Sequence, residues 1–293
     1  MFLPLPTELT IERPLLETVN FNIDEKLVAI FDAFVPLETI GRAVEVGCGV
    51  GDLSNWLAST LKGHGIVLGL DLDITALREA RHRAATGRIS NATFEIGNVY
   101  QIPLPDSYAE LVLCQNLLCV LGQVDRALEE MCRVVKPGGI IVAIEPASLQ
   151  QFYDPEDPSF TNLSVDLNRA FYEGWRSEGA DQCIGLRLPA IFLKFGLSEV
   201  TAKGLINVSL LSDAMRSRQE ILEQLSTEAA EFDPATRRML EKAGMARDSV
   251  AEFERKARER LRFFSTHEDA IRNSGYTRIS ALRMITIARR PVT

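Results

Sequence analysis

Short apolar segments alternate with amphipathic segments along the first half of the chain. Each apolar segment has only four or five residues, which predicts buried strands. The predicted strands are residues 43–46, 66–70, 92–96, 111–114 and 140–144. The segments around them carry apolar residues at helical spacing and predict helices. These helices are residues 27–34, 52–61, 75–85 and 125–135. Apolar strands that alternate with helices are typical of a mostly parallel α/β sheet, doubly wound and covered on both faces.

The pattern changes after Pro146, and this change sets the predicted domain boundaries. Residues 147–165 have the composition of a loop, and the predicted elements after them are helices at 167–175 and 188–195 and strands at 199–210 and 284–288. Two amphipathic patterns, separated by the Asp233-Pro234 cap signal, predict helices within residues 212–275. We therefore predict a seven-stranded Rossmann-like sheet with helical insertions that form a cap. Its parts are an N-terminal helix and α/β core (1–146), a substrate-side insertion with the sixth strand (147–211), a helical lid (212–275) and the last core strand (276–293).

A glycine-rich turn follows the first predicted strand. Residues 44–52 have the sequence VEVGCGVGD. Glycines between a strand and a helix let the backbone approach a ligand closely, as in the GxGxxG turn of dinucleotide enzymes. Here Asp52 occupies the place of the third glycine of that fingerprint, and Glu45 precedes the turn. Two acids disfavour a pyrophosphate and favour a ligand whose nearby group is cationic.

Further motifs follow in a specific order. They are GLDLD, which places Asp71 after the second strand, then Gly97-Asn98-Val99 after the third, Cys114-Gln115-Asn116-Leu117 after the fourth, and Arg133-Val-Val-Lys-Pro-Gly-Gly139 before the fifth. In this order they resemble the class I methyltransferases that depend on S-adenosylmethionine (SAM), in the branch that acts on small molecules. The resemblance covers about residues 25–146 and the two final strands.

The resemblance implies SAM as the cofactor and a set of residues that bind it. The glycines would admit its methionine moiety, Glu45 would favour its ammonium group, Asp71 would hold both ribose hydroxyls, and Asn98 would contact adenine. The predicted cofactor-binding residues are Glu45, Gly47, Cys48, Gly49, Gly51, Asp71, Leu72, Asn98, Val99, Gln115 and Asn116. A carboxylate suits the ribose because its two oxygens can accept from two hydroxyls.

The implied reaction is an in-line displacement, in which an O, N, S or C nucleophile of a small molecule takes the methyl group. Such chemistry depends on positioning and on exclusion of water, and it does not always need a general base. The weak candidates for a catalytic residue are Glu145, Tyr153 and His267. The weak candidates for a substrate contact are Tyr153, Tyr172 and Arg187. For each of them a surface or capping role is the more common one.

Composition and charge exclude several other classes. The net charge of −8 and the sequence pI of about 5.1 disfavour a nucleic-acid partner. The five cysteines are odd in number and form no CxxC pair, and the three histidines lie far apart, so we expect reduced thiols and no metal site. No segment has the pattern of a signal peptide or a membrane span. We expect a cytoplasmic protein with a small-molecule substrate, and a homodimer stays open.

Two alternatives keep the same fold. A SAM-binding sensor or inactive partner subunit would bind the cofactor without transferring its methyl group. An NAD-dependent oxidoreductase is disfavoured by Asp52 and Glu45. Activity against a panel of methyl acceptors distinguishes the first alternative, and calorimetry with SAM and NAD distinguishes the second.

Overall fold

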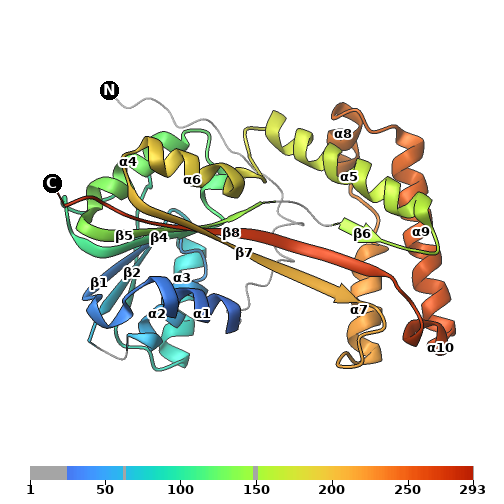
Figure 1. Cartoon of the computed structure of the whole chain (residues 1–293), viewed down its shortest axis with the longest axis horizontal. Helices are drawn as coiled ribbons and strands as arrows, with labels where there is room; N and C mark the ends of the chain where they lie inside the picture. The colour runs from blue at the N-terminus through green and yellow to red at the C-terminus, as the bar shows by residue number, and fades with distance from the viewer. Residues whose placement is uncertain (1–24, 62–63, 148–150, 293) are drawn as a thin grey trace.

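One mixed sheet organises the fold, which is taken from a computed structural model that describes residues 25–61, 64–147 and 151–292 (Figure 1). Its strands are β1 (Arg42–Val46), β2 (Ile66–Asp71), β3 (Ala92–Ile96), β4 (Ala109–Gln115), β5 (Val135–Pro146), β6 (Gln151–Tyr153), β7 (Ser198–Leu210) and β8 (Thr277–Arg289). Their order is β3-β2-β1-β4-β5-β8-β6, and β7 also pairs with β8. The strands β1 to β5 are mutually parallel, and β8 is antiparallel to β5, β6 and β7.

Helices cover both faces of the parallel part of the sheet. The described α-helices are α1 (Glu25–Phe34), α2 (Asp52–Thr60), α3 (Ile74–Thr86), α4 (Val124–Val134), α5 (Pro158–Ser177), α6 (Ile184–Lys194), α7 (Arg218–Glu228), α8 (Pro234–Lys242), α9 (Arg247–Thr266) and α10 (Glu268–Arg272). The apolar faces of α1 and α2 pack on one side of the sheet, and those of α4 and α6 pack on the other. None of these helices is both long and apolar enough to cross a membrane.

The structure confirms the predicted α/β class and corrects it in the segment after β5. The sheet has eight described strands rather than seven, because the short strand β6 lies inside residues 147–165, which were expected to form a loop. Asp157 caps α5 with its carboxylate, and Pro158 occupies the first turn, so this helix begins nine residues before the predicted start at 167. The same Asp-Pro signal at Asp233-Pro234 correctly predicted the start of a helix, and Asp233 caps α8 there.

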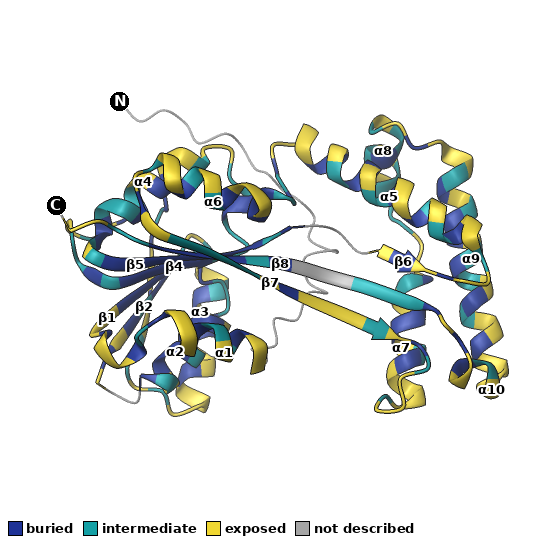
Figure 2. Ribbon diagram, viewed as in Figure 1, coloured by how far each residue is buried: buried dark blue, intermediate teal, exposed yellow. Residues whose placement is uncertain are grey.

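The helices after β7 form a separate unit with α5 and β6, which we call the helical unit (β6, α5 and α7–α10). Figure 2 shows the buried faces of these helices turned toward one another, and β7 and β8 extend from the sheet to reach them. Their apolar side chains form one cluster that includes Phe160, Trp175 and Phe253 and contains no residue of β1 to β5. The apolar stripes predicted in 212–275 are therefore buried within this unit, against α5 and β6.

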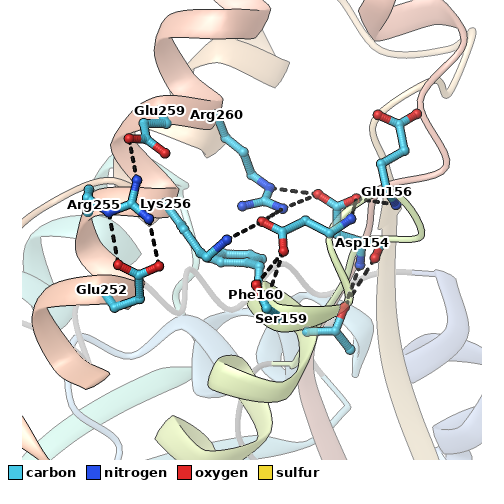
Figure 3. Close-up of polar contacts among 11 residues, drawn as sticks. Asp154, Glu156, Ser159, Phe160, Glu252, Arg255, Lys256, Glu259 and Arg260 are labelled. Atoms are coloured by element: carbon cyan, nitrogen blue, oxygen red, sulfur yellow. Dashed lines mark hydrogen bonds and ion pairs between the residues drawn. The ribbon is translucent and has the colours of Figure 1, made fainter. Parts of the chain in front are cut away.

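One buried and one half-buried ion pair hold the helical unit together (Figure 3). The Asp154 carboxylate, just after β6, accepts hydrogen bonds from Nε (2.8 Å) and Nη2 of Arg260 on α9, and both residues are buried. The guanidinium of Arg260 also lies 3.7 Å from the ring centroid of Phe160. Beside this pair, Lys256 donates to Asp157 at 2.7 Å. Charged side chains thus fix α9 against the start of α5.

Candidate active site

The glycine-rich turn lies at the carboxyl end of β1 and is fixed to β2. The amide N–H groups of Gly47 and Cys48 both donate to the carbonyl oxygen of Leu70, at 2.7 and 3.0 Å. Gly51 has φ of +79°, and a Cβ added there would lie 2.8 Å from both Ala80 and Phe94. Only glycine therefore lets α2 begin this close to α3 and β3.

Asp71, at the end of β2, faces the same turn. Its Oδ2 accepts the N–H of Gly49 at 2.7 Å, and its Oδ1 accepts the N–H of Asp73 at 2.9 Å. Each oxygen therefore has one backbone partner and can accept one further hydrogen bond. At Gly49 an added Cβ would meet nothing within 4 Å, so the turn borders open space.

Glu45 lies beneath the turn instead of at its surface. The side chain is 2 % exposed, and Oε2 accepts the hydroxyl hydrogen bond of Ser54 at 2.5 Å. Burial raises the pKa of Glu45 to about 8, and the hydrogen bond from Ser54 opposes this shift. The role of Glu45 toward the ammonium group of a ligand stays a prediction, and the structure adds Ser54, which the sequence pattern did not single out.

This burial makes the free energy of unfolding depend on pH. Between the ordinary pKa of 4.5 and the folded value of about 8, the folded chain keeps a proton that the unfolded chain has released. The contribution of Glu45 therefore falls by about 1.4 kcal/mol per pH unit as pH rises through this window. We expect Glu45→Gln to have a flatter pH profile in urea unfolding, whereas Glu173→Gln, on an exposed site of α5, keeps the profile of the wild type. Parallel profiles for the wild type and Glu45→Gln would contradict this.

The turn after β4 is held by Glu145, one of the candidate catalytic residues. Its carboxylate is fully buried and accepts the N–H groups of Leu117 (3.0 Å), Leu118 (2.8 Å) and Cys119 (3.2 Å). Burial raises the pKa of Glu145 to about 7, and the bonds from these N–H groups oppose the shift. This carboxylate orders the backbone of the turn, and its candidate catalytic role stays a prediction.

The residues predicted to contact adenine and ribose lie at the ends of β2 and β3. Leu72, next to Asp71, is 63 % exposed and offers an apolar surface, whereas Val99 is buried in the core. Asn98 forms a turn, since its Oδ1 accepts the N–H of Tyr100 at 2.9 Å. That oxygen can accept a second hydrogen bond, so its contact with adenine remains a prediction.

Two substitutions at Asn98 separate these roles. We expect Asn98→Asp to bind SAM about as well as the wild type, because an accepting oxygen remains at the same place. Asn98→Leu removes that oxygen and should bind SAM clearly more weakly, as measured by titration calorimetry. If Asn98→Leu binds SAM normally and only its thermal stability falls, the residue forms a turn and nothing more.

The remaining candidate residues do not form a cluster in the described structure. Tyr153 is 57 % exposed on β6, and Tyr172 is partly buried on α5. Arg187, on α6, forms an ion pair with Asp181. His267 lies at the junction of α9 and α10, where its ring stacks on Phe263 with centroids 4.6 Å apart. Figure 1 shows this junction at the opposite end of the molecule from β1 and α2, so His267 does not lie beside the glycine-rich turn.

The described residues offer neither a reactive cysteine in the core nor a group of side chains that could hold a metal ion. Cys114 and Cys119 are buried in the core, and burial raises the pKa of both thiols well above the ordinary value. Within residues 25–61, 64–147 and 151–292, no three His, Cys, Asp or Glu side chains are arranged to hold a metal ion. These thiols remain protonated and have the environment of core residues.

The donors and acceptors at this edge fit SAM. Asp71 has capacity for two hydroxyls, the open space at Gly49 admits a ligand close to the backbone, and Leu72 offers an apolar face. At the end of β4, Oε1 of Gln115 is buried and has no hydrogen-bond partner, so it is available to a ligand donor. Asp52, at the start of α2, is an acid where a pyrophosphate would bind, and it pairs with Arg83 at 2.6 Å.

Comparison with known proteins points to the same chemistry. Residues 44–143 match the model of a family described as a methyltransferase domain. The chain is 29 % identical to a demethylmenaquinone methyltransferase of Shouchella clausii over 169 residues, which cover 55 % of this chain and 72 % of that protein. It is 27 % identical to a probable methyltransferase of Aspergillus luteorubrus over 220 residues, or 71 % of this chain and 75 % of that one.

Solved structures show the same fold at low sequence identity. A protein of Bacillus halodurans that has been assigned to the methyltransferases superposes with a TM-score of 0.54 at 14 % identity, covering 92 % of this chain and all of that one. The [4+2]-cyclase SpnF superposes with a TM-score of 0.51 at 18 % identity, covering 92 % of this chain and 81 % of that one. A cyclase among the neighbours shows that this fold alone does not determine the reaction.

Residues 44–143 match a methyltransferase domain, and the relatives found by sequence are named methyltransferases. The solved structures add the Rossmann-like fold, and the chain is a SAM-dependent methyltransferase. SAM is its cofactor, and when bound it supplies an electrophilic methyl group.

Proposed function

We propose that the chain transfers the methyl group of SAM to a small molecule with a hydroxylated or quinol-type ring. The relatives support this class of acceptor, because one is named a demethylmenaquinone methyltransferase and another a ubiquinone/menaquinone biosynthesis C-methyltransferase. The observation that carries the proposal is the site at the glycine-rich turn, where Asp71, Gly49 and Gln115 offer the contacts that SAM needs. The accepting atom is a ring carbon or a hydroxyl oxygen.

In this proposal the chain positions SAM and the acceptor and excludes water from them, and it contributes less to proton transfer. A hydroxyl or ring C–H group must lose a proton as the new bond to the methyl carbon forms. Among the described residues at the edge, Glu145 is committed to three N–H groups, so it is not a free base. The acceptor would lie beside the ends of β4 and β5, and the helical unit would form the outer wall of its site, as a lid.

A test of this function measures turnover and binding separately. The protein is incubated with SAM and a panel of naphthoquinol, catechols, phenols, amines and thiols, and S-adenosylhomocysteine is quantified by mass spectrometry. We expect S-adenosylhomocysteine and a methylated product from the quinol or phenol members. If the protein binds SAM tightly and methylates no member of the panel, the sensor or partner-subunit function is the better account.

A further inference from the structure

Gln182 is a buried residue whose side-chain nitrogen has no hydrogen-bond partner among the described residues. It precedes α6, is 6 % exposed, and its Nε2 is buried without an acceptor. Burying an amide without a partner costs free energy, so nearly all such groups in native proteins are paired. An unpaired donor of this kind points to a partner that is not part of the folded chain.

The contacts on either side of Gln182 place it at the carboxyl ends of β4 and β5. The N–H of Asp181 donates to the carbonyl oxygen of Cys119, in the turn after β4, at 2.7 Å. One turn further on, a Cβ added at Gly185 would lie 2.8 Å from the carbonyl oxygen of Glu145, so α6 rests directly on the end of β5. Gln182 therefore lies between the turn after β4 and the last residues of β5.

The same turn connects this position to the cofactor loop. The side chain of Leu117 lies against Gly47, since a Cβ added at Gly47 would be 2.8 Å from Cδ1 of Leu117. Two residues further along the chain, the carbonyl oxygen of Cys119 accepts a hydrogen bond from the N–H of Asp181. A continuous line of contacts thus runs from the glycine-rich turn to Gln182, along the edge where the acceptor must meet the methyl group.

The two acidic side chains next to Gln182 already have partners. Asp181 is paired with Arg187, and the carboxylate of Glu145 takes three N–H groups. The nearby thiol of Cys119 remains protonated, because burial raises its pKa. What remains available is one donor, Nε2 of Gln182, and one acceptor, Oε1 of Gln115 at the end of β4. Free amides beside paired charges favour a ligand that is polar and uncharged.

We propose that Gln182 selects the methyl acceptor by hydrogen bonding to a neutral oxygen of it, a phenolic hydroxyl or a carbonyl. The proposal rests on the proposed methyl transfer and adds the class of substrate, a small uncharged oxygen-bearing molecule. An acceptor with a carboxylate or an ammonium group at this point would lose its hydration without gaining a counter-ion, and would be rejected.

The test compares Gln182→Leu and Gln182→Glu with the wild type, using naphthoquinol and a naphthoquinol that carries a ring carboxylate. We expect Gln182→Leu to raise KM for naphthoquinol about tenfold with a smaller change in kcat, the size expected for one lost hydrogen bond. The Kd for SAM should not change, and Tm should rise because the unpaired amide is gone. Gln182→Glu should weaken naphthoquinol binding without the rise in Tm.

Gln123→Leu serves as a matched control, because Gln123 is exposed at the start of α4 and its side chain makes no cap bond. It should change neither KM nor Tm.

A higher Tm with unchanged KM in Gln182→Leu would assign Gln182 to the core and overturn the proposal, as would a wild type that prefers the carboxylated ring. If no acceptor turns over, calorimetry with naphthoquinol and S-adenosylhomocysteine decides: binding that Gln182→Leu abolishes supports the role of Gln182, even though methyl transfer fails. Absence of naphthoquinol binding to the wild type overturns it.

Discussion

We expect Asp71→Ala to lower the affinity for SAM by more than about 100-fold while the sheet remains folded. In the structure one carboxylate oxygen accepts from Gly49 in the glycine-rich turn and the other accepts from Asp73, and each has capacity for one ribose hydroxyl. Hydrogen bonds to a charged acceptor contribute about 1.5–3 kcal/mol each, so two of them correspond to about 3–6 kcal/mol. The substitution also frees the N–H of Gly49, which loosens the turn that must approach the ligand. Titration calorimetry with SAM measures the effect.

Two variants control for damage to the fold. Asp71→Asn keeps one accepting oxygen at the same place and should lose less affinity than Asp71→Ala. Asp73→Ala removes the cap of α3, where Asp73 accepts from Thr75 at 2.8 Å, and should cost about 1 kcal/mol of stability with normal SAM binding. Near-normal SAM affinity in folded Asp71→Ala would remove Asp71 from the site.

Arg260→Ala should destabilise the helical unit by about 3–5 kcal/mol, because it leaves the buried carboxylate of Asp154 without its counter-ion. The chain has two tryptophans, Trp56 on α2 and Trp175 in the cluster of the helical unit. In a Trp56→Phe background, urea unfolding followed by Trp175 fluorescence therefore measures this unit. SAM binding should survive, since the core clusters contain no residue of the helical unit, while methyl transfer should fall strongly.

Matched variants show whether the loss of stability comes from breaking the buried pair or from removing any arginine of α9. Arg255→Ala, also on α9, removes an exposed arginine that pairs with Glu252 and Glu259 on the same helix, and should cost less than about 1 kcal/mol. Replacing both partners, as in Asp154→Asn with Arg260→Met, should recover much of the loss because no unpaired charge remains. Equal losses for Arg255→Ala and Arg260→Ala would show that the buried pair has no special role.

Local patterns were sufficient to predict most of the fold. The buried strands end where the apolar runs end, as at Asp71, because apolar residues in a parallel sheet are covered on both faces. The three-residue strand β6 could not be predicted, since its pairing with β8 depends on residues more than 120 positions away. The stripes in 212–275 predicted helices that bury one face, and the structure buries that face against α5 and β6. A stripe alone does not indicate which element covers it.

A local motif predicts the position of Asp71 at the end of β2, whereas residues that act through other residues carry no such motif. The spacing from the glycine-rich turn to Asp71 is a local signal of a ribose contact. The position of Glu45 under the turn depends on Ser54, and Glu145 binds a turn that comes nearly thirty residues earlier in the chain. Gln182 carries no motif at all, and only its burial without a partner distinguishes it.

A crystal structure with bound S-adenosylhomocysteine would show whether the cofactor binds at the glycine-rich turn. We expect both ribose hydroxyls on the carboxylate of Asp71, the amino acid moiety over Gly49, and the sulfur facing the turn between Gln115 and Cys119. A ligand bound elsewhere, or a ribose held by another side chain with Asp71 bonded only to Gly49 and Asp73, would contradict this expectation.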